Sequence, residues 1–207
     1  MEFDVTLYLQ IALTLFSIMD PFGLIPLFLA FTGSQSDEQR TKIIRSSVVA
    51  TAIILVITAL GGEYILSFFG IDIYSFQIAG GILLLMIALN MLQAKASMLK
   101  TTPKEQDEAI EKEDISVIPL AMPLLAGPGT ISMVIVFSAT MQTAVEKLIL
   151  VGIIILVSLS VWPILLLSKW IGHKLGNTGI NITVRIMGLI LASIAVKFIM
   201  QGIKNLM

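Results

Sequence analysis

The sequence predicts an all-α membrane protein with six transmembrane helices, arranged as two inverted three-helix repeats whose first and fourth spans are broken near the membrane midplane. Three observations predict this class. The 207 residues are 57% hydrophobic and 13% charged, with a mean hydropathy of +0.96. The apolar runs reach about 20 residues, which is what the ~30 Å hydrocarbon core of a bilayer requires. Helix-breaking motifs also lie inside the first and the fourth run.

We place the six spans by hydropathy. The runs are continuous rather than alternating, which favours helices over barrel strands. The first and fourth runs are too long, because as continuous helices they would measure roughly 40 Å at 1.5 Å per residue. Each is therefore expected to be bent or interrupted near its midpoint. The predicted spans are residues 5–31, 43–62, 74–93, 115–141, 147–169 and 183–204.

The positive charges predict the orientation. Ten lysine and arginine residues fall on one side of the predicted spans, and three fall on the other side, namely Lys147, Lys197 and Lys204. Cytoplasmic loops carry the excess of positive charge. We therefore expect a multi-pass protein of the plasma (inner) membrane, with both termini extracytoplasmic. The expected cytoplasmic loops are residues 32–42, 94–114 and 170–182. The acidic N-terminus differs from the basic start of a secretory signal, so the first run is expected to be retained.

A weak internal repeat divides the chain. A shift of 108 residues aligns residues 76–93 with 184–201, and a shift of 107 aligns Pro21 with Pro128. Three spans per repeat is an odd number, so the second copy must enter the membrane upside down, as in many secondary carriers. The predicted parts are a first three-span repeat at 1–94, a charged cytoplasmic linker at 95–114 and a second three-span repeat at 115–207.

The first break is the segment DPFGLIP at residues 20–26. Asp20 is the only carboxylate placed deep inside a predicted span, where it costs about 2.5–3.5 kcal/mol, so it should face the interior or a water-filled cavity. Proline disfavours a helical conformation in the preceding residue and suits the first helical position. We therefore interpret Asp20 as the N-cap of a half-helix beginning at Pro21. Pro26 leaves open a restart nearer that residue, with Gly23 in the unwound part.

The second break is the segment AGPGTIS at residues 126–132, which has no acid. An uncapped helix N-terminus is an anion site. We hypothesise that a small zwitterion binds between the breaks, with its carboxylate at the N–H groups of 129–131 and its ammonium near Asp20 or a cation held there. The alternative is that Asp20 only caps a helix and that the glycines only allow close helix packing. The candidate substrate-binding residues are Asp20, Gly23, Gly127, Gly129, Thr130 and Ser132, and the helix-break residues are Pro21, Pro26 and Pro128.

These motifs resemble those of a known family. The stretches DPFGLIPLFLAFT at 20–32 and PLLAGPGTIS at 123–132, with the six-span length, are similar to the MarC family of bacterial and archaeal membrane proteins. That family includes members called small neutral amino acid transporters and is grouped with the LysE-type exporters. The resemblance covers essentially the whole chain. It implies six helices, an inverted repeat and transport of a small neutral amino acid such as glycine or alanine, coupled to a proton or sodium gradient.

Other classes of function fit the sequence less well. The absence of cysteine excludes disulfides and thiol chemistry, and a net charge of -1 gives no sign of a nucleic-acid partner. His173 is the only histidine and lies among lysines, so no metal site and no cofactor beyond a coupling proton or sodium ion is expected. A membrane-embedded enzyme would need a second acid, a base or a metal beside Asp20. A channel and a non-transporting membrane protein stay open, as does a homo-oligomer. Gln77 and Asn90 either line a cavity or bond a neighbouring helix.

Overall fold

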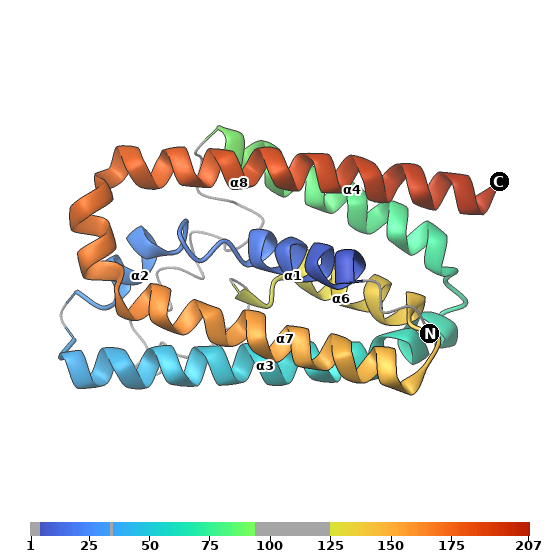
Figure 1. The fold of residues 1–207 in the computed structure, drawn as a ribbon, viewed down its shortest axis with the longest axis horizontal. Coiled ribbons are helices and arrows are strands. Elements are labelled where there is room, and N and C mark those ends of the chain that lie inside the picture. Colours follow the sequence, from blue (N-terminus) through green and yellow to red (C-terminus); the bar gives the residue numbers. More distant parts are fainter. Residues whose placement is uncertain (1–4, 34, 94–124) are drawn as a thin grey trace.

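The computed structural model describes residues 5–33, 35–93 and 125–207, and within these ranges the chain forms seven α-helices. The helices share one long axis, with α3 and α7 along one edge, α4 and α8 along the other, and α1 and α6 between them (Figure 1). The start of α1 and the end of α8 point toward the same end of the bundle. The bounds are α1 Val5–Met19, α2 Ile25–Phe31, α3 Asp37–Phe68, α4 Ile73–Leu92, α6 Pro128–Thr140, α7 Ala144–Leu166 and α8 Ser168–Leu206.

Four of these helices are long and apolar enough to cross a membrane, namely α3, α4, α7 and α8. They coincide with the predicted second, third, fifth and sixth spans. The other apolar helices are short, with 15 residues in α1 and 13 in α6, or about 20 Å at 1.5 Å per residue. The predicted first span contains both α1 and α2. The described part of the predicted fourth span is α6, because residues 115–124 lie outside the described residues, as does the linker 95–114.

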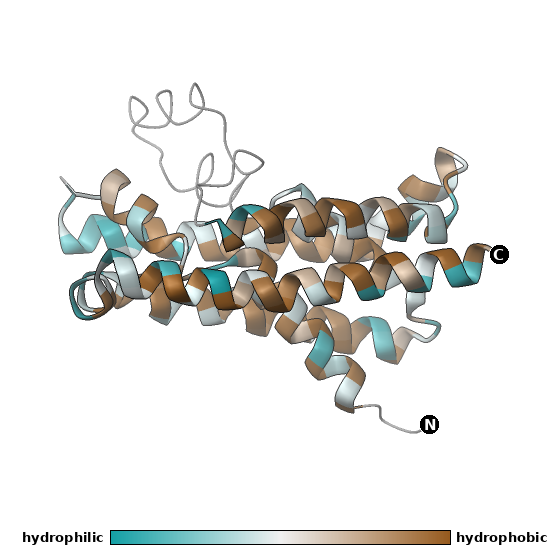
Figure 2. Cartoon of the chain, turned by 90° about the horizontal axis from the view of Figure 1, so that it is seen from above, coloured by the Kyte–Doolittle hydropathy of each residue, from teal (hydrophilic) through white to brown (hydrophobic). Residues whose placement is uncertain are grey.

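The surface of the long helices is apolar, as the composition predicts. Large side chains point outward all along them, including Ile57 at 65% exposed, Phe68 at 84% and Leu148 at 71%. Hydrophobic residues dominate the outer faces of these helices in Figure 2. A surface of this kind would promote aggregation in water, but it matches lipid tails. The chain is therefore an all-helical membrane protein.

Two loop predictions need correction. The expected loop 170–182 is helical, because α8 begins at Ser168 and is interrupted only by a kink at Gly176, whose φ is +59°. The expected loop 32–42 is shorter than predicted, because α3 already begins at Asp37. Both segments are polar helical turns beyond the apolar run, so hydropathy does not mark them as helix.

The antiparallel helices α3 and α7 begin with the same capping motif. The Ser36 hydroxyl accepts from the Gln39 N–H at 3.2 Å, and the Gln39 side chain accepts from the Ser36 N–H at 2.9 Å. Thr143 and Glu146 make the same reciprocal pair at the start of α7. Each capping box satisfies two N–H groups that the first turn of a helix leaves unpaired. The two boxes start 107 residues apart in the sequence.

Close backbone contacts join α4 to α8. A Cβ added at Gly81 would lie 3.2 Å from the Ala195 carbonyl oxygen and 3.2 Å from the Ile199 nitrogen. A Cβ added at Gly188 would lie 3.1 Å from the Ala88 carbonyl oxygen and 3.1 Å from the Leu92 nitrogen. Each residue of the first set corresponds to one of the second at a shift of 107, so the contact pairs Gly188 with Gly81 and not with Gly80. Small residues let the two helices approach this closely in a membrane.

Candidate functional site: two helix breaks and an open pocket

The first break lies between α1 and α2, and Asp20 ends α1. Asp20 is buried, with 6% of its surface exposed, and its φ of +47° is the only positive φ among the described non-glycine residues. Its N–H donates to the Phe16 carbonyl oxygen at 3.1 Å, which is the bond of a left-handed helix C-terminus. Aspartate tolerates this conformation better than most side chains. Pro21 follows directly and cannot continue the helix.

The Asp20 side chain holds the turn after the break. Its Oδ1 accepts from the Gly23 N–H at 3.1 Å, and its carbonyl oxygen accepts from the Leu24 N–H at 3.2 Å. The next helix begins only at Ile25, with Pro26 in its first turn and no side-chain cap. The predicted half-helix beginning at Pro21 is therefore wrong, and the alternative restart near Pro26, with Gly23 in the unwound part, is confirmed. A Cβ on Gly23 would overlap the Asp20 carboxylate, so this turn requires glycine.

The second break lies at the start of α6. Gly127 is the buried N-cap, with an extended backbone and no side chain to cap the helix, and Pro128 occupies the first turn as predicted. The first backbone bond of α6 runs from the Ile131 N–H to the Gly127 oxygen at 3.0 Å. The Thr130 hydroxyl donates back to the Leu125 oxygen at 3.0 Å, so it is already engaged in the break. The N–H groups ahead of Ile131 have no acceptor within the helix.

The two breaks lie against each other. A Cβ at Gly129 would be 3.6 Å from Ile18 Cγ2, at the end of α1, and 2.6 Å from Ile87 Cδ1 on α4. Gly129 is therefore close-packed by apolar side chains on its Cα side, which is the packing role that the sequence left open. Ser132, one turn further along α6, is half-buried, and its Cβ faces Gly80 of α4.

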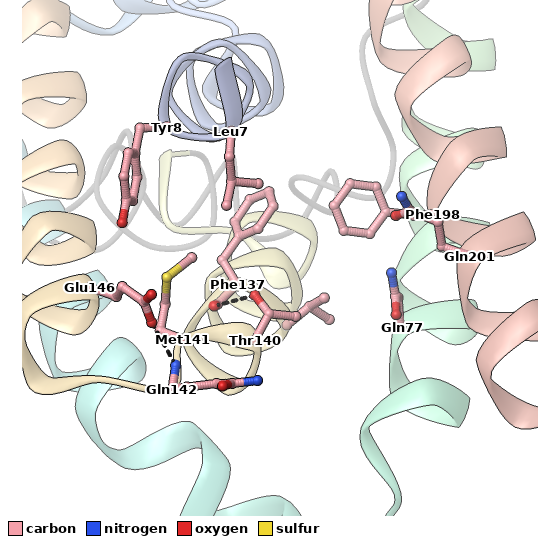
Figure 3. Close-up of a pocket in the computed structure, with 11 residues that line it drawn as sticks. Leu7, Tyr8, Gln77, Phe137, Thr140, Met141, Gln142, Glu146, Phe198 and Gln201 are labelled. Carbon is pink, nitrogen blue, oxygen red and sulfur yellow. Dashed lines mark hydrogen bonds between the residues drawn. The ribbon is translucent and has the colours of Figure 1, made fainter. Parts of the chain in front are cut away.

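A pocket of about 310 Å³ opens at the end of the bundle where α6 finishes. Figure 3 shows side chains from α1, α4, α6, α7 and α8 around it, with Gln77 and Gln201 on one side and Tyr8 and Glu146 on the other. Gln77 is buried at 6% exposed and lines the pocket, which answers the question that the sequence left open for it. The remaining lining residues are Leu7, Val136, Phe137, Thr140, Met141, Gln142 and Phe198.

One carboxylate contributes to the wall of this pocket. Glu146 Oε2 accepts from the Gln142 N–H at 2.8 Å and from the Thr143 N–H at 3.0 Å. The sequence did not single out these residues as a site, because they lie on five helices that only the folded chain brings together. Lys197, set aside as structural, donates to Gln10 Oε1 at 2.9 Å near the same end.

The opposite end of the bundle is closed by a buried arginine. Arg40 on α3 is 6% exposed, and its Nη2 donates to the Ser168 hydroxyl at 3.2 Å at the start of α8. Its guanidinium lies 5.4 Å from the ring centroid of Phe28 on α2, within the range of a cation–π contact. The sequence counted Arg40 only among the charges that orient the protein. Its buried contacts tie the second half of the broken first span to the corner between α7 and α8.

The described residues contain no group of three or more histidine, aspartate or glutamate side chains placed to hold a metal ion. The polar groups available to a ligand are therefore hydroxyls, amides, single carboxylates and the amides of the helix breaks. Groups of this kind bind a small polar molecule by hydrogen bonds and by charge.

Comparison with known proteins agrees with this architecture. The sequence profile described as "MarC family integral membrane protein" matches residues 5–207. The UPF0056 membrane protein YhcE of Escherichia coli is 38% identical over 204 residues, which is 99% of this chain and 95% of the relative. A UPF0056 membrane protein of Aquifex aeolicus is 37% identical over 206 residues, covering 100% of this chain and 96% of the relative.

An archaeal relative extends the similarity beyond bacteria. A UPF0056 membrane protein of Methanocaldococcus jannaschii is 41% identical over 193 residues, or 93% of each chain. No solved structure matches the chain. The match over nearly the full length shows that this chain belongs to the MarC family of integral membrane proteins.

Proposed function

We propose that this chain is a secondary carrier of small neutral amino acids, and that its solute site lies at the junction of the two helix breaks. The observation that carries the proposal is that both breaks occur, and that the end of α1 packs against the first turn of α6 through Ile18 and Gly129. Irregular backbone inside a membrane is tolerated where protein or a water-filled cavity satisfies it. Carriers built from repeats place their sites at such interrupted helices.

An inverted repeat supports this proposal. The capping boxes that begin α3 and α7, the prolines of the two breaks, and the tight glycines Gly81 and Gly188 all recur at a shift of 107 residues. Because α3 runs antiparallel to α7, equivalent helices of the two halves have opposite directions (Figure 1). That is the relation expected of an inverted pair, in which alternating access comes from rocking one repeat against the other.

The two ends of the bundle differ in a way that suits a carrier. The pocket opens at the end that holds Lys147, Lys197 and the end of α8, whereas Arg40 closes the other end. The excess of positive charge assigns the Arg40 end to the cytoplasm. We therefore take this conformation to be open to the outside, with the pocket as the entrance.

The chemistry of the site favours a zwitterion. The first turn of α6 offers N–H groups and the positive end of its helix dipole to a carboxylate. Asp20 offers a buried carboxylate to an ammonium group or to a coupling proton or sodium ion. The pocket on the way adds neutral amides and one carboxylate, Glu146, which suits a ligand with no net charge.

Uptake by purified protein in liposomes tests the proposal. We expect labelled glycine and alanine to enter with saturable kinetics, to show counterflow, and to respond to an imposed proton or sodium gradient. A channel would give uptake that rises linearly with concentration and shows no counterflow. Absence of uptake across a panel of small neutral amino acids, with either gradient in either direction, would overturn the proposed function.

A further inference from the structure

Two hydroxyl groups in the bundle interior are fully buried and have no hydrogen-bond partner. They belong to Thr51 on α3, at 0% exposed, and Ser158 on α7, at 1% exposed. Other hydroxyls on the described helices donate to a carbonyl oxygen of the preceding turn, as Thr58 does to Ile54 at 2.8 Å and Ser160 does to Val157 at 2.6 Å. A buried hydroxyl without a partner loses free energy relative to water, so its retention calls for a role.

The register of α3 and α7 places these two hydroxyls opposite each other. Glu63 pairs with Lys147 at 2.8 Å near one end of the interface, and Arg40 bonds Ser168 near the other. Thr51 lies midway between Arg40 and Glu63 along α3. Ser158 lies midway between Lys147 and Ser168 along the antiparallel α7. The two residues are also equivalent at the shift of 107, so the axis that relates the two repeats passes between them.

The pair lies at the level of the two helix breaks. Helix α6 starts near the middle of the bundle and runs in the same direction as α3 (Figure 1). Further along, the Ser138 hydroxyl donates to the Ala59 carbonyl oxygen, and Ile135 packs on Gly62. Following α6 back from these contacts brings its first turn beside the middle of α3, where Thr51 lies. The end of α1 reaches the same level, because Ile18 lies next to Gly129.

We propose that Thr51 and Ser158 form a binding site for the carboxylate of the transported amino acid, an inference that rests on the proposed function. Each hydroxyl has a free O–H to donate, and the two donors are related by a two-fold axis, as are the two oxygens of a carboxylate. The carboxylate accepts one hydrogen bond from each helix, so ligand binding satisfies both buried groups. The ammonium group is then left for the acid of the first break. Hydrogen bonds to a charged group are the stronger kind.

The proposal predicts opposite effects on stability and on binding. Thr51→Val and Ser158→Ala remove the hydroxyls with little change of shape, so the ligand-free variants are expected to melt at a higher temperature than the parent protein. Their affinity for alanine should fall by roughly tenfold or more, the usual loss for one hydrogen bond to a charged group. The matched controls Thr58→Val and Ser160→Ala remove hydroxyls that are already bonded, and they should leave the affinity unchanged without raising the melting temperature.

The experiment compares melting in detergent with the binding of labelled alanine and of alaninamide, which lacks the carboxylate. The parent protein should prefer alanine to alaninamide, and the Thr51 and Ser158 variants should lose that preference. If the parent binds alanine and these variants bind it equally well, or if they melt at lower temperatures as a bonded hydroxyl would require, the hydroxyl site is refuted while the carrier proposal stands. If the parent binds neither ligand, both proposals fail.

Discussion

Asp20→Asn should leave the fold intact and abolish most of the transport. Asparagine keeps an Oδ1 that accepts from the Gly23 N–H, and it also tolerates the left-handed conformation found at this position. The substitution removes only the charge. Interactions with a charged group are worth about 1.5–3 kcal/mol, so we expect uptake of alanine to fall by at least about tenfold. Initial uptake rates in proteoliposomes, normalised to folded protein by circular dichroism, measure the effect.

Asp20→Ala is the companion variant, because it removes both the charge and the structural role. Loss of a capping side chain costs about 1 kcal/mol, and a left-handed conformation costs alanine roughly 1–2 kcal/mol more. This variant should therefore lose stability as well as transport. If Asp20→Asn transports as fast as the parent while Asp20→Ala unfolds, Asp20 serves only as the cap that its contact with Gly23 describes.

Gly81→Ala and Gly188→Ala should destabilise the protein by similar amounts. At each position a Cβ would meet a backbone oxygen and a backbone nitrogen of the facing helix at 3.1–3.2 Å. Backbone atoms cannot move aside as a flexible side chain can, so α4 and α8 must separate. Overpacking of this kind costs about 1–3 kcal/mol. Equal effects are expected because the contacts of Gly81 and Gly188 correspond to each other across the repeat.

Gly152→Ala supplies the control for these two variants. Gly152 lies inside α7, and a Cβ there would meet nothing within 4 Å. Because alanine favours a helix over glycine by up to ~1 kcal/mol, this variant should be neutral or more stable. Unfolding in mixed micelles, followed by circular dichroism, compares the three. A large loss for only one of Gly81 and Gly188 would contradict their equivalence.

The sequence predicted the class of fold because hydropathy and charge act locally. Long apolar runs identify helices such as α3 and α7, and prolines identify breaks, whatever the rest of the chain does. Where α2 begins was less predictable. It depends on Asp20 taking a positive φ and on its carboxylate holding Gly23, a choice between two turns that proline alone does not decide. The helical residues after Ser168 escaped prediction because they are polar.

The contacts of the site depended more on tertiary structure. The sequence identified both breaks, but the packing of Gly129 on Ile18 and Ile87 follows from how three helices meet. The pocket at Gln77 draws its walls from five helices, and no local pattern announces that. Arg40 illustrates a signal that was available. It begins the buried stripe of α3, one turn before Ile44, and a charge on such a stripe indicates an inward-facing role.

Reversible cross-linking of the two breaks tests the central claim most directly. The chain has no cysteine of its own, so a disulfide can form only between introduced residues. Ile18→Cys with Gly129→Cys places the two thiols at the junction, where a Cβ on Gly129 would lie 3.6 Å from Ile18 Cγ2. The pair Ile18→Cys with Gly152→Cys is the control. With the junction pair we expect oxidation to form the bond and stop alanine uptake, and reduction to restore it. Failure of the bond to form, or undiminished uptake by cross-linked protein, would contradict a solute site at this junction.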